Sequence, residues 1–268
     1  MLRFDFGARS DTGLVRHNNE DAGFAGPYLL LVADGVGGAA AGEVASATAA
    51  YVVAAMARAH LFRHPAALLA AAVAEAHHQL QLGVADHAER DGMATTLTAV
   101  LLEGGHAAIA HLGDSRAYLL RDGELTRLTS DHTLVQAMVD EGRITPEQAR
   151  EHPYRSVVVR SLNHELAQPP DLGEIDLLVG DRLLLCSDGL TDYVDEPEVA
   201  TLLGAGPDVL AVATALVDAA LAAESRDNVT CLVADVVDGP EVVGDGVILG
   251  ALADPGLVVD PAAVRRRG

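Results

Sequence analysis

The chain has 268 residues, half of them hydrophobic, which excludes wholesale disorder and allows one large domain or two small ones. All 18 basic residues are arginine, so a Schiff-base lysine, a P-loop lysine and a kinase-type strand lysine are all excluded. The net charge of −21 argues against binding of a nucleic-acid backbone. Phosphate binding then needs a local cation, either an arginine or a metal ion.

The N-terminal half is expected to combine several strands with two long helices. Leu2–Ala8 alternates apolar and polar residues, as a half-buried strand does, and Asp11–Asp21 is polar and loop-like. Ala-rich stretches predict helices over Glu43–His60 and Pro65–Glu89. Further strands are expected at Tyr28–Ala33, Thr95–Leu102, His106–Gly113, Arg116–Leu120 and Leu125–Leu128.

The C-terminal half is expected to contain a less apolar insert, a strand pair, two helices and a last strand. The insert, about residues 131–161, holds short helices at His132–Glu141 and Pro146–Glu151. The later elements are a strand pair at Ile175–Val179 and Arg182–Cys186, helices at Glu196–Leu203 and Pro207–Ala223, and a strand at Asn228–Val237. Residues 239–268 are rich in Gly, Pro and Asp and end in Arg265-Arg266-Arg267-Gly268, which predicts a loosely ordered tail after a folded domain of residues 1–238.

Strands joined by hairpins, with helices grouped in pairs, favour an α+β class of antiparallel sheets flanked by helices. Cys186 and Cys231 lie inside apolar runs and are expected to be buried strand thiols. The first residues contain no apolar leader, and no apolar run approaches the roughly 18 residues of a membrane span. We therefore expect a cytoplasmic protein.

Aspartates at strand ends are the strongest chemical signal. Asp34, Asp114 and Asp188 each close an apolar run, and Asp227 precedes one. Carboxylates at strand ends can converge on one rim of a sheet sandwich, and several packed together cannot all stay ionised without a cation. Oxygen ligands without His or Cys spacing favour magnesium or manganese over zinc. For any one of these residues alone, an ordinary Asp turn is the alternative.

The loop around Arg16 adds a cation to this pattern. Arg16 is followed by Glu20 and Asp21 in a polar segment. The guanidinium can bind phosphate oxygens bidentately while the two acids orient metal-bound water. A solvated surface turn is the alternative interpretation.

Six motifs carry a resemblance to a known family. They occur in the order RxxNED, DGVGG, GxATTLTA, GDSRAYL, SDGL and DNVT, from Arg16 to Thr230. Together they closely resemble the metal-dependent protein phosphatase family, also called protein phosphatase 2C. They look most like its compact bacterial branch, which acts opposite Ser/Thr kinases. The match runs from about Ser10 to Val237.

The resemblance implies a four-layer α-β-β-α sandwich with two tightly bound Mn²⁺ or Mg²⁺ ions at its rim. Asp34 would bridge both ions, the Gly35 carbonyl would ligate one, and Asp188 and Asp227 would complete the other. The other implied roles are water binding by Glu20 and Asp21, phosphate binding by Arg16, a third, weaker ion at Asp114, and a place beside the last ligand for Asn228. Residues 131–161 match a mobile flap beside the cleft. Val36 stands where some relatives carry a histidine that has been proposed as the general acid.

The implied activity is hydrolysis of phosphoserine and phosphothreonine on proteins, by a water or hydroxide that bridges the two ions. The expected partners are phosphorylated proteins, including Ser/Thr kinases and their substrates, with no nucleic acid or membrane partner, and the chain is expected to be a monomer. Three alternatives stay open: a non-catalytic phosphoprotein-binding module, an anti-sigma-type regulatory phosphatase, and a magnesium-dependent hydrolase of small phosphoesters. The first should have lost metal ligands, the second usually lacks a full RxxNED loop and flap, and substrate competition separates the third.

Overall fold

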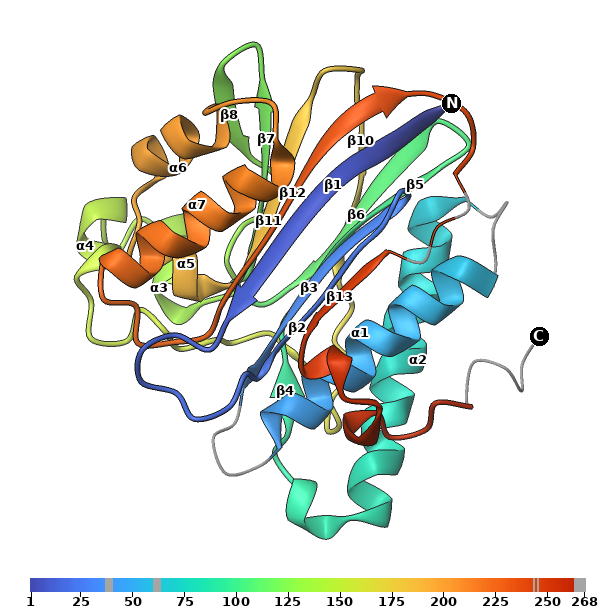
Figure 1. The fold of residues 1–268 in the computed structure, drawn as a ribbon. Helices are drawn as coiled ribbons and strands as arrows, with labels where there is room; N and C mark the ends of the chain where they lie inside the picture. Colours follow the sequence, from blue (N-terminus) through green and yellow to red (C-terminus); the bar gives the residue numbers. More distant parts are fainter. Residues whose placement is uncertain (37–40, 60–63, 243, 245, 263–268) are drawn as a thin grey trace.

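Two antiparallel sheets pack face to face in the computed structural model, which describes residues 1–36, 41–59, 64–242, 244 and 246–262 (Figure 1). The first sheet has the order β1 (Leu2–Asp11), β12 (Val229–Asp238), β11 (Arg182–Cys186), β7 (Arg116–Arg121), β8 (Glu124–Arg127). The second has the order β10 (Asp171–Ile175), β6 (His106–Leu112), β5 (Leu97–Glu103), β3 (Leu29–Val36), β2 (Asp21–Ala25), β13 (Val247–Gly250). The short strands β4 (Ala94–Thr95) and β9 (Leu162–Asn163) extend from the end of β3.

Helices cover the outer face of each sheet (Figure 1). The helices α1 (Gly42–Ala59) and α2 (Pro65–Asp86) cover the second sheet. Those over the first sheet are α5 (Asp188–Thr191), α6 (Glu196–Leu203) and α7 (Val209–Ala222). The helices α3 (Leu134–Asp140) and α4 (Pro146–Arg150) lie within the predicted flap segment. The four-layer α-β-β-α prediction is confirmed.

Three buried clusters fill the three spaces between these layers. Strand β3 shows how the sequence supplies two of them at once. Leu30 and Val32 point into the space between the sheets, and Leu29, Leu31 and Ala33 point toward α1 and α2. Successive side chains of a strand face opposite sides, so a strand covered on both faces needs a continuous apolar run. The rim of the sandwich begins where that run stops, at Asp34.

The elements in the first half follow the prediction closely, with one omission. Strand β2 follows the polar loop directly and pairs with β3, and all five of its residues are buried. The prediction of a loop up to Asp21 left this strand out. Gly37 and Gly38 of the DGVGG motif and His60, the predicted end of the first helix, lie outside the described residues.

Two predictions in the second half are wrong, the strand pair and the loosely ordered tail. Ile175–Val179 does not pair with β11, because the strand is Asp171–Ile175 and its partner is β6 in the other sheet. A turn follows it, in which the Asp181 carboxylate accepts from the Leu178 amide at 2.7 Å and from the Arg121 guanidinium at 2.7 Å. This double contact holds the chain in a bend where an extended strand was predicted.

The tail after Asp238 is not loosely held where it is described. Val247–Gly250 pairs with β2 as the edge strand β13, and Ala251, Leu252 and Val258 are buried against α1. Strand β13 hydrogen-bonds to the edge of the sheet, and the residues after it gain burial against α1, neither of which composition reveals. The terminal arginines Arg265, Arg266 and Arg267 lie outside the described residues.

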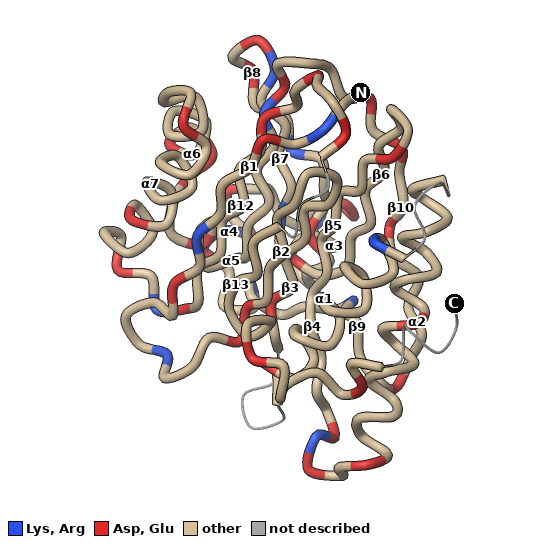
Figure 2. Tube along the Cα trace, turned by 45° about the vertical axis from the view of Figure 1, so that its right-hand side comes forward, with Lys and Arg blue, Asp and Glu red and all other residues tan. Residues whose placement is uncertain are grey.

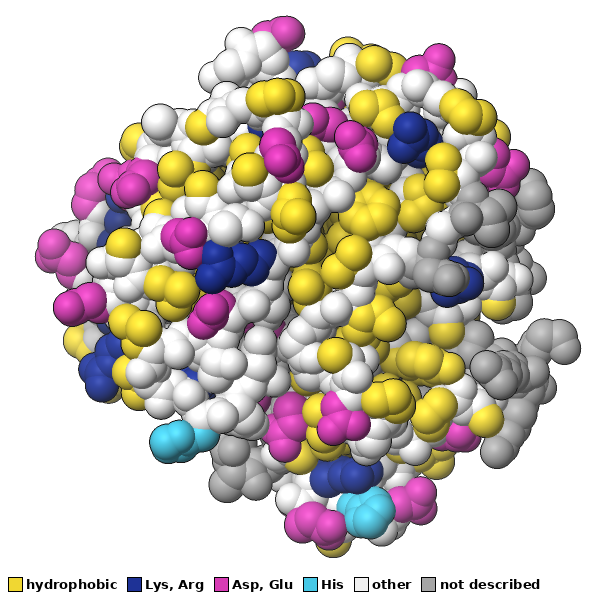
Figure 3. All heavy atoms as spheres, in the orientation of Figure 1, with side chains coloured by type: hydrophobic (Ala, Val, Ile, Leu, Met, Phe, Trp, Pro, Cys, Tyr) yellow, Lys and Arg dark blue, Asp and Glu magenta, His cyan; other side chains and the backbone are white. Residues whose placement is uncertain are grey.

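The surface reflects the charge imbalance. Acidic positions outnumber basic ones along the loops and helix ends (Figure 2). An apolar hollow of about 570 Å³, lined by residues such as Phe24, Tyr51 and Ile248, lies between α1 and β13 on the face seen in Figure 3. Over the described residues, no helix combines the length and apolar character needed to cross a membrane.

Candidate metal centre and active site

Five strand ends bring five carboxylates to one rim of the sandwich. Asp21 and Asp34 are directly paired residues of β2 and β3. Asp114 follows β6, Asp188 begins α5 after β11, and Asp227 precedes β12. The charges of the other four raise the pKa of Asp34, after burial, which is the largest cause. The five aspartates predicted from sequence therefore share one electrostatic environment.

Backbone contacts fix Asp34 and Gly35 at the end of β3. The Asp34 amide donates to Thr96 Oγ1 at 2.8 Å, and Thr95 Oγ1 donates to the Asp34 carbonyl at 2.9 Å. Gly35 donates to the Glu20 carbonyl at 3.1 Å. A Cβ at Gly35 would lie 2.4 Å from the Gly42 carbonyl oxygen, so only glycine fits this close approach of two backbones.

Asn228 holds the Arg16 loop against the start of β12. Its Oδ1 accepts from the Glu20 amide at 2.8 Å, and its Nδ2 donates to the carbonyls of Thr12 and Asn18 at 2.9 Å each. Arg16 Nη2 then reaches Asp227 Oδ2 at 2.8 Å. The guanidinium is 44% exposed, so it lies at the rim and is open to a ligand from solvent.

Buried carboxylate oxygens without a partner mark the centre of the rim. Ser187 Oγ donates to Asp21 Oδ2 at 2.7 Å, but Asp21 Oδ1 and Asp188 Oδ1 have no hydrogen-bond partner. Burial raises the pKa of Asp21 to about 6, and burial together with neighbouring carboxylates raises that of Asp188 well above its ordinary value. Unpaired buried carboxylates are costly unless a cation satisfies them, so this donor set fits a hard divalent ion.

The shell of such an ion is not made by side chains alone. Among the described residues, no three or more His, Cys, Asp and Glu side chains form a group that could hold a metal ion. An ion here would take the rest of its shell from backbone carbonyls and water. Magnesium keeps several waters and binds through one or two carboxylates, which suits this arrangement.

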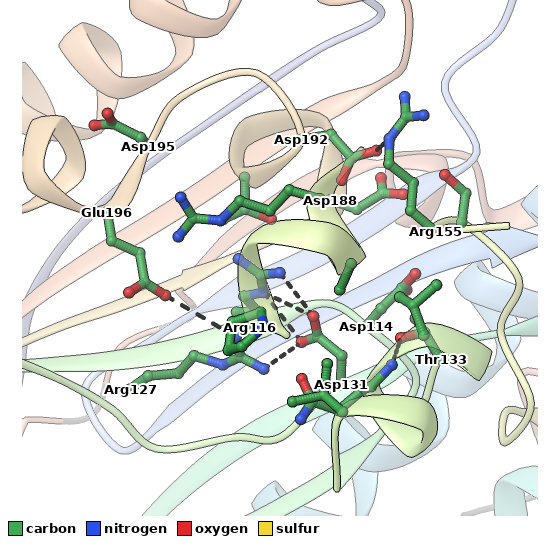
Figure 4. A pocket seen from close by; sticks show the side chains of 18 of the residues that line it. Asp114, Arg116, Arg127, Asp131, Thr133, Arg155, Asp188, Asp192, Asp195 and Glu196 are labelled. Atoms are coloured by element: carbon green, nitrogen blue, oxygen red, sulfur yellow. Dashed lines mark hydrogen bonds and ion pairs between the residues drawn. The ribbon is translucent and has the colours of Figure 1, made fainter. Parts of the chain in front are cut away.

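Asp114 stands at the edge of the rim, beside a cavity of about 400 Å³ (Figure 4). Burial, followed by the charges of Asp131 and Asp192, raises the pKa of Asp114 to about 7. Asp188 and Asp192 line the same cavity together with residues of α3 and α4. The flap segment thus forms one wall of a space that opens onto the carboxylate cluster.

Several residues of the site escaped the sequence analysis. Asp192 is four residues after Asp188 in the α5 segment, and this helical spacing is a signal that could have found it. Ser187 and Thr96 gave no such signal, since a single hydroxyl in a strand is common. Glu20 lies where it was expected, 7% exposed, with its pKa raised chiefly by burial.

The fold and site together are a four-layer α-β-β-α sandwich with a buried carboxylate cluster at its rim that fits divalent ions. Residues 16–235 match the family described as protein phosphatase 2C. The chain is 47% identical to the serine/threonine protein phosphatase PstP of Mycobacterium tuberculosis H37Rv over 252 residues, 92% of this chain and 48% of that protein. It is 33% identical to the serine/threonine phosphatase stp of Listeria monocytogenes EGD-e over 243 residues, 85% of this chain and 94% of that protein.

A solved structure of the PstP catalytic domain in complex with two manganese ions is also similar, with a TM-score of 0.83 and 45% identity. The similarity covers 89% of this chain and 100% of that chain. The chain spans about half the length of the PstP sequences it matches. The chain belongs to the protein phosphatase 2C family of metal-dependent phosphatases.

Proposed function

We propose that this chain is a metal-dependent phosphatase that hydrolyses phosphoserine and phosphothreonine on proteins. The observation that carries this proposal is the buried set of Asp21, Asp34 and Asp188, whose charges are uncompensated and two of whose oxygens lack partners. The similarity to PstP and stp, both named serine/threonine phosphatases, supports the same substrate class. Every predicted metal-site aspartate is present at the rim, which argues against a non-catalytic binding module.

The proposed ligands of two divalent ions are Asp34, the Gly35 carbonyl, Asp188 and Asp227, with Asp114 near a third, weaker ion. When bound, such ions acidify water and neutralise charge on the phosphoryl group. Arg16 would bind two phosphate oxygens, while Glu20 and Asp21 would accept hydrogen bonds from water near the centre. Asn228 would keep the loop that carries Arg16 and Glu20 in place through its hydrogen bonds to that loop.

The chain's own side chains offer no thiol nucleophile. Cys186 and Cys231 are fully buried, and burial raises the pKa of Cys186 to about 12. A thiol that stays protonated at neutral pH cannot attack phosphorus. Val36, next to Gly35, has no proton to donate to the leaving oxygen. Direct attack by water is therefore the proposed route, without a covalent enzyme intermediate.

The proposed partners are phosphorylated proteins, including Ser/Thr kinases and their substrates. This proposal is supported by the names of the relatives PstP and stp, which are serine/threonine phosphatases. We further propose that the chain acts in cytoplasmic signalling and as a monomer. The net charge of −21 is consistent with a well-solvated protein that does not bind nucleic acid.

The test is hydrolysis of a phosphothreonine peptide with Mn²⁺, in the presence and absence of excess chelator. Activity should require the ion, and Asp34→Ala should abolish it. Asp5→Ala removes an exposed carboxylate from β1 and serves as the matched control. Full activity in chelator, or an active Asp34→Ala enzyme, would refute the two-ion site. If small phosphoesters outcompete the peptide, the domain acts on small substrates instead.

A further inference from the structure

A buried histidine joins the flap segment (residues 131–161) to the rim. His132 is 7% exposed and stands directly before α3. Its backbone amide donates to the Gly113 carbonyl at 2.8 Å, and the Gly113 amide donates to His132 Nδ1 at 3.1 Å. One residue of the flap segment thus satisfies both backbone groups of Gly113, the residue immediately before Asp114.

The other ring nitrogen reaches the far side of the flap segment. His132 Nε2 lies 2.9 Å from Asp171 Oδ2, at the start of β10. Arg160 Nη2 donates to the same carboxylate at 2.8 Å, and its Nη1 lies 2.8 Å from Nε2. Because Nδ1 accepts from Gly113, the proton of the neutral ring belongs on Nε2, where Asp171 accepts it. With the proton on Nε2, Arg160 Nη1 cannot donate to that nitrogen, and the Asp171 carboxylate is the acceptor that His132 and Arg160 share.

The contact continues from Gly113 to Asp34. Gly113 has a φ of +106°, and a Cβ there would lie 2.5 Å from the Thr96 side chain. Thr96 Oγ1 accepts from the Asp34 amide at 2.8 Å and also contacts Ser115 Oγ at 2.8 Å. His132 is therefore hydrogen-bonded to Gly113, Gly113 leaves no room for a side chain beside Thr96, and Thr96 holds the backbone amide of Asp34.

The same end of the flap segment is tied down twice. Asp131 accepts from Arg116 Nη2 at 2.7 Å and from Arg127 Nη2 at 2.9 Å (Figure 4). The Val159 amide donates to the His132 carbonyl at 2.8 Å, which brings the two ends of the segment together. The ion pairs hold the chain near the rim, while His132 contacts Gly113, the residue next to Asp114, through both its backbone amide and its imidazole.

We propose that His132 is a positioning residue: its imidazole accepts from the Gly113 amide and donates to Asp171, and so sets the place of Asp114 at the rim. This inference rests on the proposed function only for its catalytic consequence. The hydrogen bond to Gly113 and its effect on ion binding can be measured without turnover.

Two substitutions separate the two ring nitrogens. In His132→Asn the amide reaches the position of Nδ1 and can still accept from Gly113. In His132→Gln the amide reaches the position of Nε2 and can still contact Asp171, but the Gly113 amide loses its acceptor. His164→Gln is the matched control, since His164 is 15% exposed and pairs with Asp91 at 3.1 Å away from the flap segment.

The first measurement is amide hydrogen exchange at Gly113 in the metal-free protein. His132→Gln should speed this exchange at least tenfold, while His132→Asn and His164→Gln stay within threefold of the parent. Calorimetric titration with Mn²⁺ should show that His132→Gln weakens the weakest binding phase at least tenfold and leaves the tight phase unchanged. With an aryl phosphate, kcat should fall about tenfold in this variant and KM should change less than twofold.

Equal behaviour of the Asn and Gln variants in exchange and titration would overturn the inference. Faster exchange in His132→Gln with unchanged Mn²⁺ binding and unchanged kcat would also overturn it, because His132 would then be purely structural. An inactive parent enzyme would instead refute the proposed function, and the exchange and titration results would still decide the role of His132.

Discussion

Asp21 offers a direct test of the electrostatic description of the rim, because its substitution should stabilise the metal-free protein. Burial raises the pKa of Asp21 from 3.8 to about 6. Between pH 3.8 and about pH 6, the folded chain therefore keeps a proton on Asp21 that the unfolded chain has already released. Stability that depends on this proton is present below pH 4 and is lost as the pH rises to about 7. The shift corresponds to about 3 kcal/mol for this one group.

Asp21→Asn removes the loss of stability that accompanies ionisation of this buried carboxyl group. The Asn carbonyl can still accept from Ser187 Oγ, which donates to Asp21 Oδ2 at 2.7 Å. Its amide nitrogen would face the negative charges of Asp34 and Asp227, which also favours the neutral, donating group. In excess chelator at pH 7.5 we expect Asp21→Asn to unfold with a free energy about 2–3 kcal/mol higher than the parent. At pH 4.5 the difference should fall to about 1 kcal/mol, because the unfolded group is by then mostly ionised while the folded group is mostly protonated.

Urea unfolding at the two pH values, with chelator and then with Mn²⁺, measures both effects. The parent should gain more stability from the ion than the variant, because binding to the folded state stabilises it in proportion to affinity. Asp5→Asn, an exposed strand position, is the control and should show no pH-dependent difference. A variant that is less stable than the parent at pH 7.5 in chelator would refute the picture of an uncompensated buried carboxylate.

Three further predictions concern the loop, the weak site and the tail. Arg16→Ala should lower kcat/KM about ten- to two-hundredfold, since a charged hydrogen bond contributes roughly 1.5–3 kcal/mol. Arg16→Lys should recover only part of this loss. Wild-type kcat/KM in Arg16→Ala, with unchanged inhibition by inorganic phosphate, would exclude a phosphate contact. Asp114→Ala should slow turnover while calorimetry still shows the tight ions; loss of the tight phase would place Asp114 among the primary ligands. Leu252→Ala should cost about 2–3 kcal/mol in urea unfolding, because the side chain is buried against α1; no loss would mean that the tail does not pack in solution.

Much of the fold could be predicted because its signals are local. The helix Glu196–Leu203 has the predicted bounds, since Asp195 caps its first turn and accepts from the Glu198 amide at 2.9 Å. The apolar runs that stop at an aspartate predicted the bounds of β11 and the course of β3 up to Asp34, although β3 continues to Val36. A run and its end are written in consecutive residues, so no knowledge of partners is needed.

Partner choice could not be predicted in the same way. The strand Asp171–Ile175 pairs with β6, more than sixty residues earlier, instead of with its neighbour β11. The edge strand β13 exists because β2 presents an open edge, which no feature of the tail reveals. The hydroxyls of Ser187 and Thr96 and the ring of His132 act through contacts made far along the chain. Their types are common in any strand or loop, so only the folded arrangement shows their role.

In the proposed mechanism Arg16 pairs with Asp227 in the metal-free protein and with phosphate in the substrate complex, and the exposure of the pair sets the cost of changing partner. Arg16 pairs with Asp227, a proposed metal ligand, at 2.8 Å. The two side chains are 44% and 36% exposed, so the pair contributes only about 0–1 kcal/mol. An ion that recruits Asp227 therefore has little to overcome, and the guanidinium is then left free beside it.

The small cost of separating Arg16 from Asp227 matters in a chain with no lysine and a net charge of −21, where an arginine is the only side-chain cation of fixed charge that can bind phosphate. Arg116, which lines the cavity, is engaged more firmly, with contacts to Asp131 at 2.7 and 3.0 Å. A buried bidentate pair would resist exchange, and an arginine held that way could not turn to a phosphate. Arg16 is held weakly enough to change partner. Removing it should therefore alter Mn²⁺ affinity less than about fivefold, the equivalent of about 1 kcal/mol, while the effect on phosphate binding is much larger.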